Sequence, residues 1–353
     1  MRRAQLFIAV ILVLIILLGW LAFAKIKASS APPTIKIGLI APFEGHYRST
    51  GYEVLIAVKL ALRARNQGQG LNGYRVELVA LNDFNEPDEA IRQAKALVAD
   101  PDVVGVVGHF SSEATQAALP VYQNAGMAVV VPWSVDEEIF KDDTRGVVGV
   151  AATRAEMADQ LQAVGRQLGF EQLYGLSGVN DVEVLSVGTQ ALQLNADAVT
   201  AGNILLALQE QGISVPVFAQ ADAGNRQLVQ VAGTAADGVI FVSPGPNATD
   251  IQLGAPFTEA YQTQAGFPPP PRAVLAYDAA NVLLDSIEQA MITNNSWFEE
   301  RPDRARISEV IHNVQYQGLS GKIEFDGSGR RIDAPVWIYQ ISGTIYPGQV
   351  VVH

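Results

Sequence analysis

Two adjacent serines, Ser111 and Ser112, follow a short apolar run and precede a segment of helical composition. The run, Val103 to Val107, is rich in β-branched residues, as fully buried parallel strands are, and residues 113–124 follow as the helical segment. A strand-to-helix junction of this kind directs unpaired backbone N–H groups and two hydroxyls into a crevice. Because a helix N-terminus attracts negative charge, the junction predicts a site for a small anion, typically a carboxylate or a phosphate.

Alternating strands and helices must position this junction. The expected strands are residues 35–41, 75–82, 103–107 and 128–131, and the expected helices are residues 52–66, 88–99 and 113–124. Short loops join them, and the last of these strands ends at Pro132-Trp133-Ser134. The alternation predicts an α/β fold with a parallel, doubly wound sheet, whose ligand crevice lies at the carboxyl ends of the strands.

Several motifs add a family resemblance to this pattern. They are IKIGLIAPFEG from residue 35, DFNEPDEA from 83, VVGVVGHFSSEATQAALPVYQNAG from 103, VVVPWS from 129, AYDAANVL from 276 and GLSGKIEFDGSGRR from 318. In this order, and over most of residues 35–345, they resemble the type I periplasmic binding proteins, specifically the leucine/isoleucine/valine-binding branch of ABC-transporter receptors. The resemblance implies a two-lobed fold, in which each lobe is a doubly wound, mainly parallel sheet and the lobes close on a ligand.

The resemblance also implies how the chain divides between the lobes. Residues 34–150 and 247–331 are expected to form lobe 1, and residues 151–246 and 332–353 are expected to form lobe 2, with three crossings and a hinge between them.

Lobe 2 is expected to be shortened relative to the family. Strands expected at residues 170–176 and 196–200 leave only residues 177–195 between them. The family pattern supplies a loop with an aromatic residue, a helix, a strand and a second helix at this point. One helix, with or without a strand, is therefore expected to be missing.

Residues 1–33 are expected to be an N-terminal transmembrane or signal helix followed by a linker. The apolar stretch from Leu6 to Ala24 is about 28 Å long as a helix, close to the roughly 30 Å of a bilayer's hydrocarbon core. The alternative to a retained membrane anchor is a cleaved signal peptide, because Ala22-Phe23-Ala24 matches an A-x-A cleavage site. With Arg2 and Arg3 held in the cytoplasm, both alternatives place the remaining chain outside it, in the periplasm or at the cell surface.

Composition argues against several other classes of protein. The formal net charge of −12 argues against nucleic-acid binding, because contact with the phosphate backbone needs clustered Lys and Arg. The chain has no cysteine, and its four histidines are isolated, so neither a disulfide nor a metal site is expected. Nucleophile-elbow, Walker and dinucleotide-binding motifs are missing too. We therefore expect no cofactor, no catalytic residue and no enzymatic activity.

The ligand implied by the resemblance is an amino acid or a similar small carboxylate. An α-amino acid presents a carboxylate and an ammonium group, so its receptor needs N–H and hydroxyl donors on one side and a carboxylate on the other. Ser111 and Ser112, with the nearby backbone N–H groups, are the expected donors. By the resemblance, Ser134 and Val135 occupy a second contact strip, where valine replaces a frequent family threonine and one hydrogen bond is lost. Asp222 aligns with the family's acidic position and is the expected ammonium partner.

Apolar contact is expected from Trp133 and from Tyr47 or Thr50 in the first loop. Each of the main assignments has a purely structural alternative. Ser112 could be an ordinary helix N-cap, Asp222 a solvated loop carboxylate, and Trp133 a residue that packs between the lobes.

Two functions follow from these expectations. The first is an extracytoplasmic solute-binding receptor that closes on an amino acid or similar small carboxylate and delivers it to an ABC permease. The second is a membrane-anchored sensory or degenerate module, which keeps the fold but has no ordinary amino-acid ligand.

Overall fold

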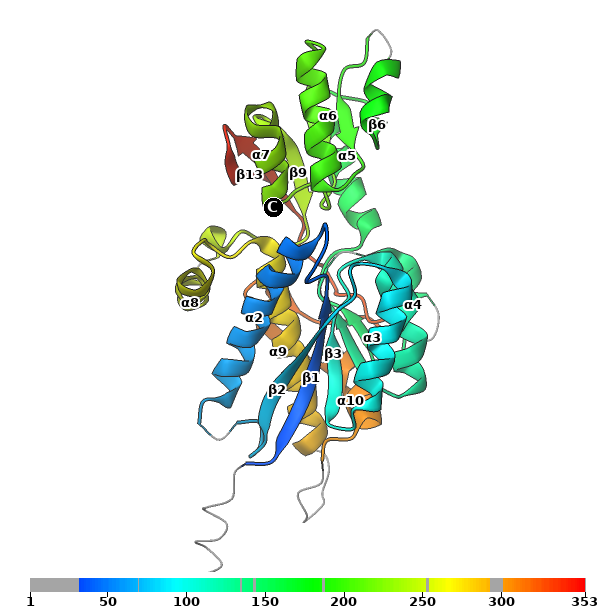
Figure 1. The fold of residues 1–353 in the computed structure, drawn as a ribbon, viewed down its shortest axis with the longest axis vertical. Helices are drawn as coiled ribbons and strands as arrows, with labels where there is room; N and C mark the ends of the chain where they lie inside the picture. The colour runs from blue at the N-terminus through cyan, green and yellow to red at the C-terminus, as the bar shows by residue number, and fades with distance from the viewer. Residues whose placement is uncertain are drawn as a thin grey trace, which may run out of the picture.

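The computed structural model describes residues 32–68, 70–133, 135–141, 144–185, 188–251, 254–292 and 301–352. The predicted N-terminal helix and Ser134 lie outside these residues. Among the helices that the structure describes, none is both long enough and apolar enough to cross a membrane. The described chain is organised around two large sheets, which occupy the two halves of the elongated molecule in Figure 1.

The first sheet has five strands, all parallel, in the order β2-β1-β3-β4-β5. They are β1 (Thr34–Ala41), β2 (Arg75–Asn82), β3 (Val103–Val107), β4 (Ala128–Val131) and β5 (Val147–Gly149). Its helices are α2 (Arg48–Asn66), α3 (Pro87–Ala99), α4 (Ser112–Asn124), α9 (Pro271–Ile292) and α10 (Arg304–Val310). Helices cover both faces, which explains why β3 and β4 are apolar throughout, whereas the edge strand β2 carries the exposed residues Arg75 and Glu77.

Successive side chains of these strands pack into two different cores. Ile40, Val106 and Val129 belong to the core that includes α3 and α4, whereas their neighbours Leu39, Val107 and Val130 belong to the core that includes α2 and α9. Figure 1 shows these two helix pairs on opposite sides of the sheet. The predicted doubly wound arrangement of this lobe is therefore confirmed.

The second sheet has six strands in the order β13-β12-β9-β8-β7-β6. They are β6 (Tyr174–Leu176), β7 (Leu192–Leu194), β8 (Val217–Ala219), β9 (Ile240–Ser243), β12 (Trp337–Ser342) and β13 (Ile345–Val352). The first four run parallel, and β12 and β13 add an antiparallel edge. The helices of this lobe are α5 (Arg154–Gln167), α6 (Ala198–Glu210) and α7 (Arg226–Ala232). Leu161 of α5 shares a core with Phe218, whereas α6 and α7 share the other core with Phe241.

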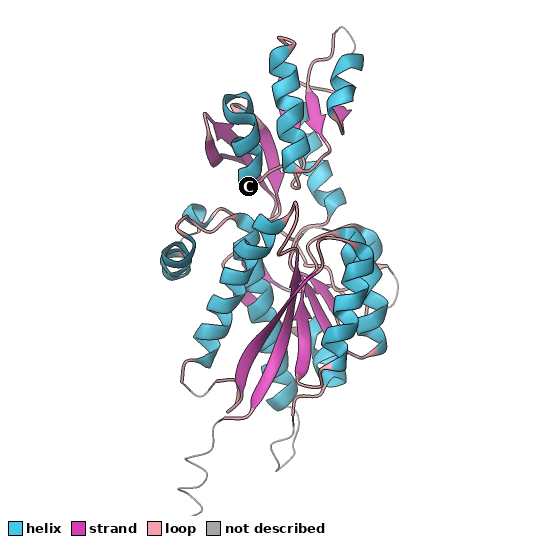
Figure 2. Ribbon diagram, viewed as in Figure 1, coloured by secondary structure: helices cyan, strands magenta, loops and turns pink. Residues whose placement is uncertain are grey.

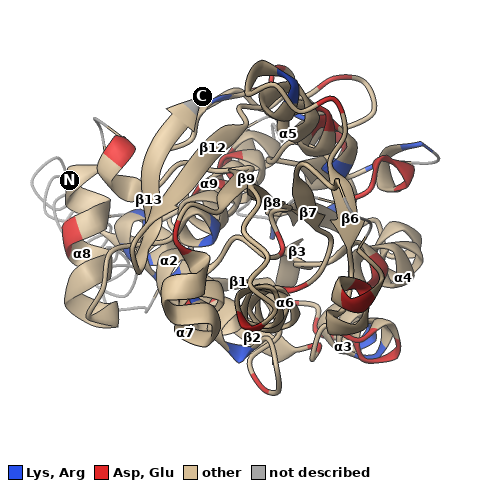
Figure 3. Cartoon of the chain, turned by 90° about the horizontal axis from the view of Figure 1, so that it is seen from above, with Lys and Arg blue, Asp and Glu red and all other residues tan. Residues whose placement is uncertain are grey.

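The chain passes between the two sheets three times, after β5, after β9 and before β12. Helix α8 (Ala255–Ala265) and the hairpin of β10 (Tyr316–Gly318) and β11 (Gly321–Ile323) complete the regular elements, with 3-10 helices at Glu137–Phe140, Val179–Val184, Gly233–Ala236, Ala248–Asp250 and Ile311–Asn313. Figure 2 shows the loops that cross between the lobes. Figure 3 shows acidic residues spread over both lobes, in keeping with the net charge of −12.

The second lobe differs from the predicted one in two ways. The strand predicted at residues 196–200 is wrong, because Asp197 caps α6 by accepting hydrogen bonds from the N–H groups of Val199 (2.9 Å) and Thr200 (3.2 Å). This cap outweighs the strand preference of those β-branched residues. Residues 177–195 were predicted to lack one helix, with or without a strand. The strand is present there as β7, and the described part of residues 177–191 contains the 3-10 helix Val179–Val184 and no α-helix.

A buried polar cluster joins two of the segments that cross between the lobes, the one after β5 and the one before β12. The carboxylate of Asp278 accepts hydrogen bonds from the backbone N–H groups of Leu319 and Ser320, both at 2.8 Å, and from the Ser320 hydroxyl at 2.6 Å. The Arg331 guanidinium donates to Ser320 Oγ and to the carbonyl of Val150, both at 3.0 Å. Burial lowers the pKa of Arg331 to about 10, although the Asp278 carboxylate opposes this shift. The cluster therefore fixes where the chain leaves the first sheet.

Candidate functional site

A cleft of about 660 Å³ lies between the lobes. Its lining comes from residues that follow β1, β2 and β3 in lobe 1 and from residues that follow β7 and β8 in lobe 2. The cleft is thus at the carboxyl ends of the parallel strands, where the alternation of strands and helices predicted it. Its charged lining residues are Glu113, Arg154, Asp197, Asp222 and Arg272.

The serine junction borders this cleft through Ser111. Ser111, and not Ser112, is the N-cap of α4, and its Oγ accepts a hydrogen bond from the N–H of Ala114 at 3.2 Å. Ser112 is buried, and its Oγ accepts from the N–H of Asp136 at 2.9 Å. Because each of these bonds uses only an acceptor position of a hydroxyl, both serines keep an O–H group to donate. Ser112 does not border the described cleft, so its predicted ligand contact stays a prediction.

A buried polar triad supports the junction from below. The imidazole Nδ1 of His109 lies 2.8 Å from Asp83 Oδ2, and its Nε2 lies 3.2 Å from the Tyr122 hydroxyl. These three residues join the ends of β2 and β3 to α4, and all are completely buried. From its sequence spacing His109 was predicted to be an isolated histidine. Its partners lie in other elements, which only the fold brings together.

Trp133 and Asp222 meet between the lobes. Trp133, which is 3% exposed, directs its indole N–H toward Asp222 Oδ1 at 3.4 Å. The guanidinium of Arg272 also contacts Trp133. Its central carbon lies over the indole ring, 4.3 Å from the ring centroid. Trp133 thus packs between the lobes while its two neighbours, Asp222 and Arg272, border the cleft.

Arg154 is a second basic residue of the cleft that the sequence analysis did not identify. Its Nη2 lies 3.1 Å from Asp222 Oδ2, and its Nη1 lies 3.7 Å from Glu113 and 3.6 Å from Asp136. Asp222 is therefore an ion-paired residue, not a freely solvated carboxylate. Two of its lone-pair positions are used, which leaves acceptor capacity for a ligand.

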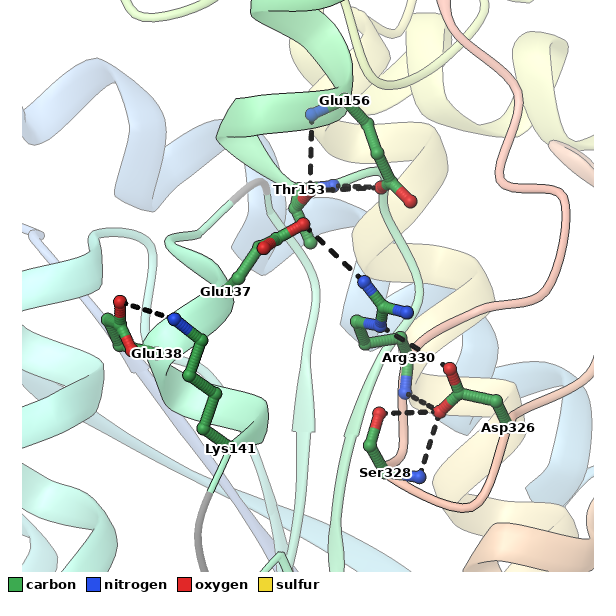
Figure 4. A network of polar contacts seen from close by, with 8 residues as sticks. All are labelled: Glu137, Glu138, Lys141, Thr153, Glu156, Asp326, Ser328 and Arg330. Atoms are coloured by element: carbon green, nitrogen blue, oxygen red, sulfur yellow. Dashed lines mark hydrogen bonds and ion pairs between the residues drawn. The ribbon is translucent and has the colours of Figure 1, made fainter.

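The start of α5 determines where Arg154 lies. Thr153 and Glu156 form a capping box, in which each side chain bonds to the other residue's backbone N–H (Figure 4). Nearby, Arg330 contacts Glu137 at 3.5 Å and Asp326 at 3.3 Å. The Thr-x-x-Glu spacing is a local signal for a helix that begins at Arg154.

The first loop closes one side of the cleft with the predicted residues Tyr47 and Thr50. Burial raises the pKa of Tyr47, and the carboxylates of Asp197, Asp222 and Glu113 raise it further. Next to Tyr47, His46 Nε2 lies 3.2 Å from Asp197 Oδ1 across the cleft.

Asn85 also borders the cleft, and it adds an acceptor that no partner satisfies. Its Oδ1 is buried and has no hydrogen-bond partner among the described residues. Since a buried polar atom without a partner is costly, this oxygen is available to a ligand or to water.

A second cavity of about 370 Å³ lies beside the cleft and shares Arg272 with it. Glu53 of α2, Arg226 of α7 and Phe267 also border this cavity. The Arg226 guanidinium stacks on the Phe267 ring at 4.3 Å, and its Nε has no hydrogen-bond partner among the described residues. Burial raises the pKa of Glu53 to about 7, and Arg272 and Arg226 oppose this shift.

Neither cavity has the composition of a metal centre. Within the described ranges, no three His, Cys, Asp or Glu side chains lie close enough together to hold a metal ion.

Known proteins share both the sequence pattern and the fold of this chain. The model of the family described as periplasmic binding protein matches residues 34–182 and 148–344. A leucine-, isoleucine-, valine-, threonine- and alanine-binding protein of Pseudomonas aeruginosa is 23% identical over 342 residues, covering 85% of this chain and 88% of the relative. An amino acid binding protein of the same organism is 25% identical over 335 residues, covering 84% and 87%.

Solved structures agree on the fold. A leucine binding protein, LivK, of Thermotoga maritima superposes with a TM-score of 0.76 at 21% identity, over 88% of this chain and 96% of that one. The branched-chain amino acid transporter substrate binding protein LivJ of Streptococcus pneumoniae, solved in complex with isoleucine, gives a TM-score of 0.78 at 17% identity, over 91% and 98%.

Proposed function

The chain belongs to the periplasmic binding protein family, and on this premise we propose that it is an extracytoplasmic receptor for an amino acid or a similar small carboxylate. Its two lobes close on the ligand, and the closed form delivers the ligand to an ABC permease. The N-terminal apolar stretch serves as a membrane anchor or as an export signal. No bond is made or broken in this function, which is binding coupled to hinge closure.

One observation carries the proposal: the cleft presents hydroxyl and N–H donors on one side and a carboxylate on the other. The Ser111 hydroxyl and the N-terminus of α4 border it from lobe 1, and Asp222 borders it from lobe 2. An α-amino acid carries the complementary pair, a carboxylate for the first and an ammonium group for the second. Each charge-assisted hydrogen bond contributes about 1.5–3 kcal/mol, and micromolar affinity needs about 8 kcal/mol.

The Arg154 contact is compatible with this assignment. The ion pair holds Asp222 Oδ2 at 3.1 Å from Arg154 Nη2 and leaves other acceptor positions of the carboxylate open to an ammonium group. When the lobes close, the ammonium group takes the remaining acceptor positions of Asp222, and Tyr47 and Thr50 cover the ligand from the first loop.

The second candidate is a sensory or degenerate module without an ordinary amino-acid ligand. The observation that favours it is the connection between β6 and β7, whose described part contains a 3-10 helix and no α-helix, as the predicted shortening of lobe 2 requires. The wall that lobe 2 offers to a ligand is altered on this side.

Calorimetric titration of the purified protein with the common amino acids separates the two candidates. If the receptor function is right, one chemical class binds, and Ser111→Ala and Asp222→Asn each weaken binding about tenfold or more, the loss of one charge-assisted bond. Asp159→Asn is the matched control, because Asp159 is an exposed carboxylate of α5 outside the cleft. Unchanged affinity in both cleft variants would refute the site, and no binding by any amino acid would favour the second candidate.

A further inference from the structure

We propose that the ligand of the cleft is an α-amino acid with an acidic side chain, and that Arg272 is the residue that selects it. This inference rests on the proposed receptor function and adds the substrate class. It starts from the charged residues that border the cleft: among the residues that the structure describes, most of them have an ion-pair partner and one has none.

Four of the five charged residues that border the cleft have partners among the described residues: Glu113, Arg154, Asp197 and Asp222. Arg154 contacts Asp222 and Glu113. Asp197 caps α6 and contacts His46. A ligand that approaches these residues meets charges that the protein has largely balanced.

Arg272 is different. It is only 8% exposed, and its side chain forms no hydrogen bond and no ion pair with any residue that the structure describes. Glu53 is close enough for Arg272 to affect its pKa, yet burial outweighs this effect and raises the pKa of Glu53 to about 7. Glu53 is therefore a weak counter-charge. Arg272 borders the cleft with a positive charge that no described carboxylate pairs directly, so a ligand anion in the cleft can supply that pairing.

The way Arg272 is held suits recognition of a carboxylate. Its central guanidinium carbon lies over the Trp133 ring, 4.3 Å from the centroid, in a cation–π contact that uses no N–H group as a hydrogen-bond donor. No residue that the structure describes accepts a hydrogen bond from these N–H groups, and a guanidinium can bind a carboxylate with two parallel hydrogen bonds.

Trp133 also relates Arg272 to the predicted ammonium site. Its indole N–H contacts Asp222, while its ring face holds Arg272. The acidic and the basic anchor are thus one indole ring apart. A ligand that places its ammonium group at Asp222 therefore has a second anionic group within reach of Arg272 when it carries a short acidic side chain.

The test compares L-glutamate with L-glutamine, which has the same shape without the side-chain charge. Calorimetry on the wild-type protein is expected to give glutamate an affinity at least about tenfold higher, the difference that one charge-assisted bidentate pair makes. Arg272→Gln is expected to bring the two affinities to within about threefold, mainly by weakening glutamate. Arg48→Gln is the control, because Arg48 is an exposed arginine at the start of α2 that does not border the cleft, and it should keep the preference.

The possible outcomes distinguish failure of this inference from failure of the proposed receptor function. Equal binding of glutamate and glutamine by the wild type, or a preference for leucine over both, would overturn the inference and leave the receptor function standing. No binding by any amino acid would overturn both. Should Arg272→Gln fail to fold, Arg272→Lys serves in its place, and is expected to reduce the preference because an ammonium group cannot form the bidentate pair. An unchanged preference in a folded Arg272 variant would also overturn the inference.

Discussion

The buried carboxyl group of Glu53 leads to a prediction that tests the electrostatics between the lobes. Its pKa is raised from 4.5 to about 7, mainly by burial beside the second cavity. Between these two pH values the folded protein keeps the proton and the unfolded chain releases it. The free energy of unfolding therefore falls as the pH rises through this window and is constant above it, as far as this group is concerned.

The magnitude follows from the size of the shift. About 2.5 pH units at about 1.4 kcal/mol per unit amount to about 3 kcal/mol. Glu53→Gln keeps the shape of the side chain and removes the titration. The variant should equal the wild type below pH 4.5 and exceed its stability by up to about 3 kcal/mol above pH 7.

Urea denaturation followed by tryptophan fluorescence, repeated from pH 4 to pH 8, measures this difference. The free energy of unfolding falls by about 1–3 kcal/mol per molar urea, so a difference of this size shifts the midpoint measurably. Glu259→Gln is the matched control, because Glu259 is exposed on α8, and its difference from the wild type should not vary with pH. If the curves of Glu53→Gln and the wild type stay parallel across the window, burial does not set the protonation of Glu53 and the reasoning is wrong.

Two further substitutions test packing near the cleft and beneath it. Gly51→Ala would place a Cβ 2.3 Å from the Pro42 carbonyl oxygen, so the first loop must move. We expect the free energy of unfolding to fall by about 1–3 kcal/mol in urea denaturation and ligand binding to weaken in calorimetry. Gly178→Ala is the control, because its Cβ would meet open space, and it should change neither quantity. Asp278→Asn leaves the charge of buried Arg331 uncompensated and should cost about 3–5 kcal/mol. Asp278→Asn combined with Arg331→Met should recover part of that loss, and a double variant no more stable than the single one would contradict this account.

The first lobe could be predicted from the sequence because its signals are local. The strands predicted at residues 75–82, 103–107 and 128–131 have the bounds of β2, β3 and β4. Each is a short run bounded by turn or helix-start residues, and helices on both faces require the continuous apolar runs seen in β3 and β4.

The second lobe was harder to predict from the sequence, because its strands are short and a helix N-cap determines where α6 begins. β7 is three residues long, Leu192–Leu194, too short for any periodicity to show. The prediction at residues 196–200 followed the strand preference of Val199 and Thr200, and missed that Asp197 starts a helix there.

The sequence predicted where the cleft lies, but only some of the residues that line it. Ser111 was identified from its position after a predicted strand and Asp222 from the family resemblance, and both border the cleft. Arg154 and Arg272 were missed, because their contacts with Asp222 and Trp133 join segments far apart in the chain. Arg272 is the one basic residue of the largely buried helix α9 and lies in its first turn, which is the signal that could have pointed to it.

The position of β12 and β13 in the second sheet also sets the order in which a newly made chain can fold. All five strands of the first sheet precede residue 150, but the second sheet lacks its last two strands until residues 337–352 have been synthesised. Until then the backbone edge of β9 has no neighbour on that side, and such an open edge can pair with another chain. Pairings this distant in the sequence also form slowly. The interval before the C-terminal strands arrive is therefore the time at which this protein is most exposed to aggregation, and a chain cut short before β12 would keep that exposed edge permanently.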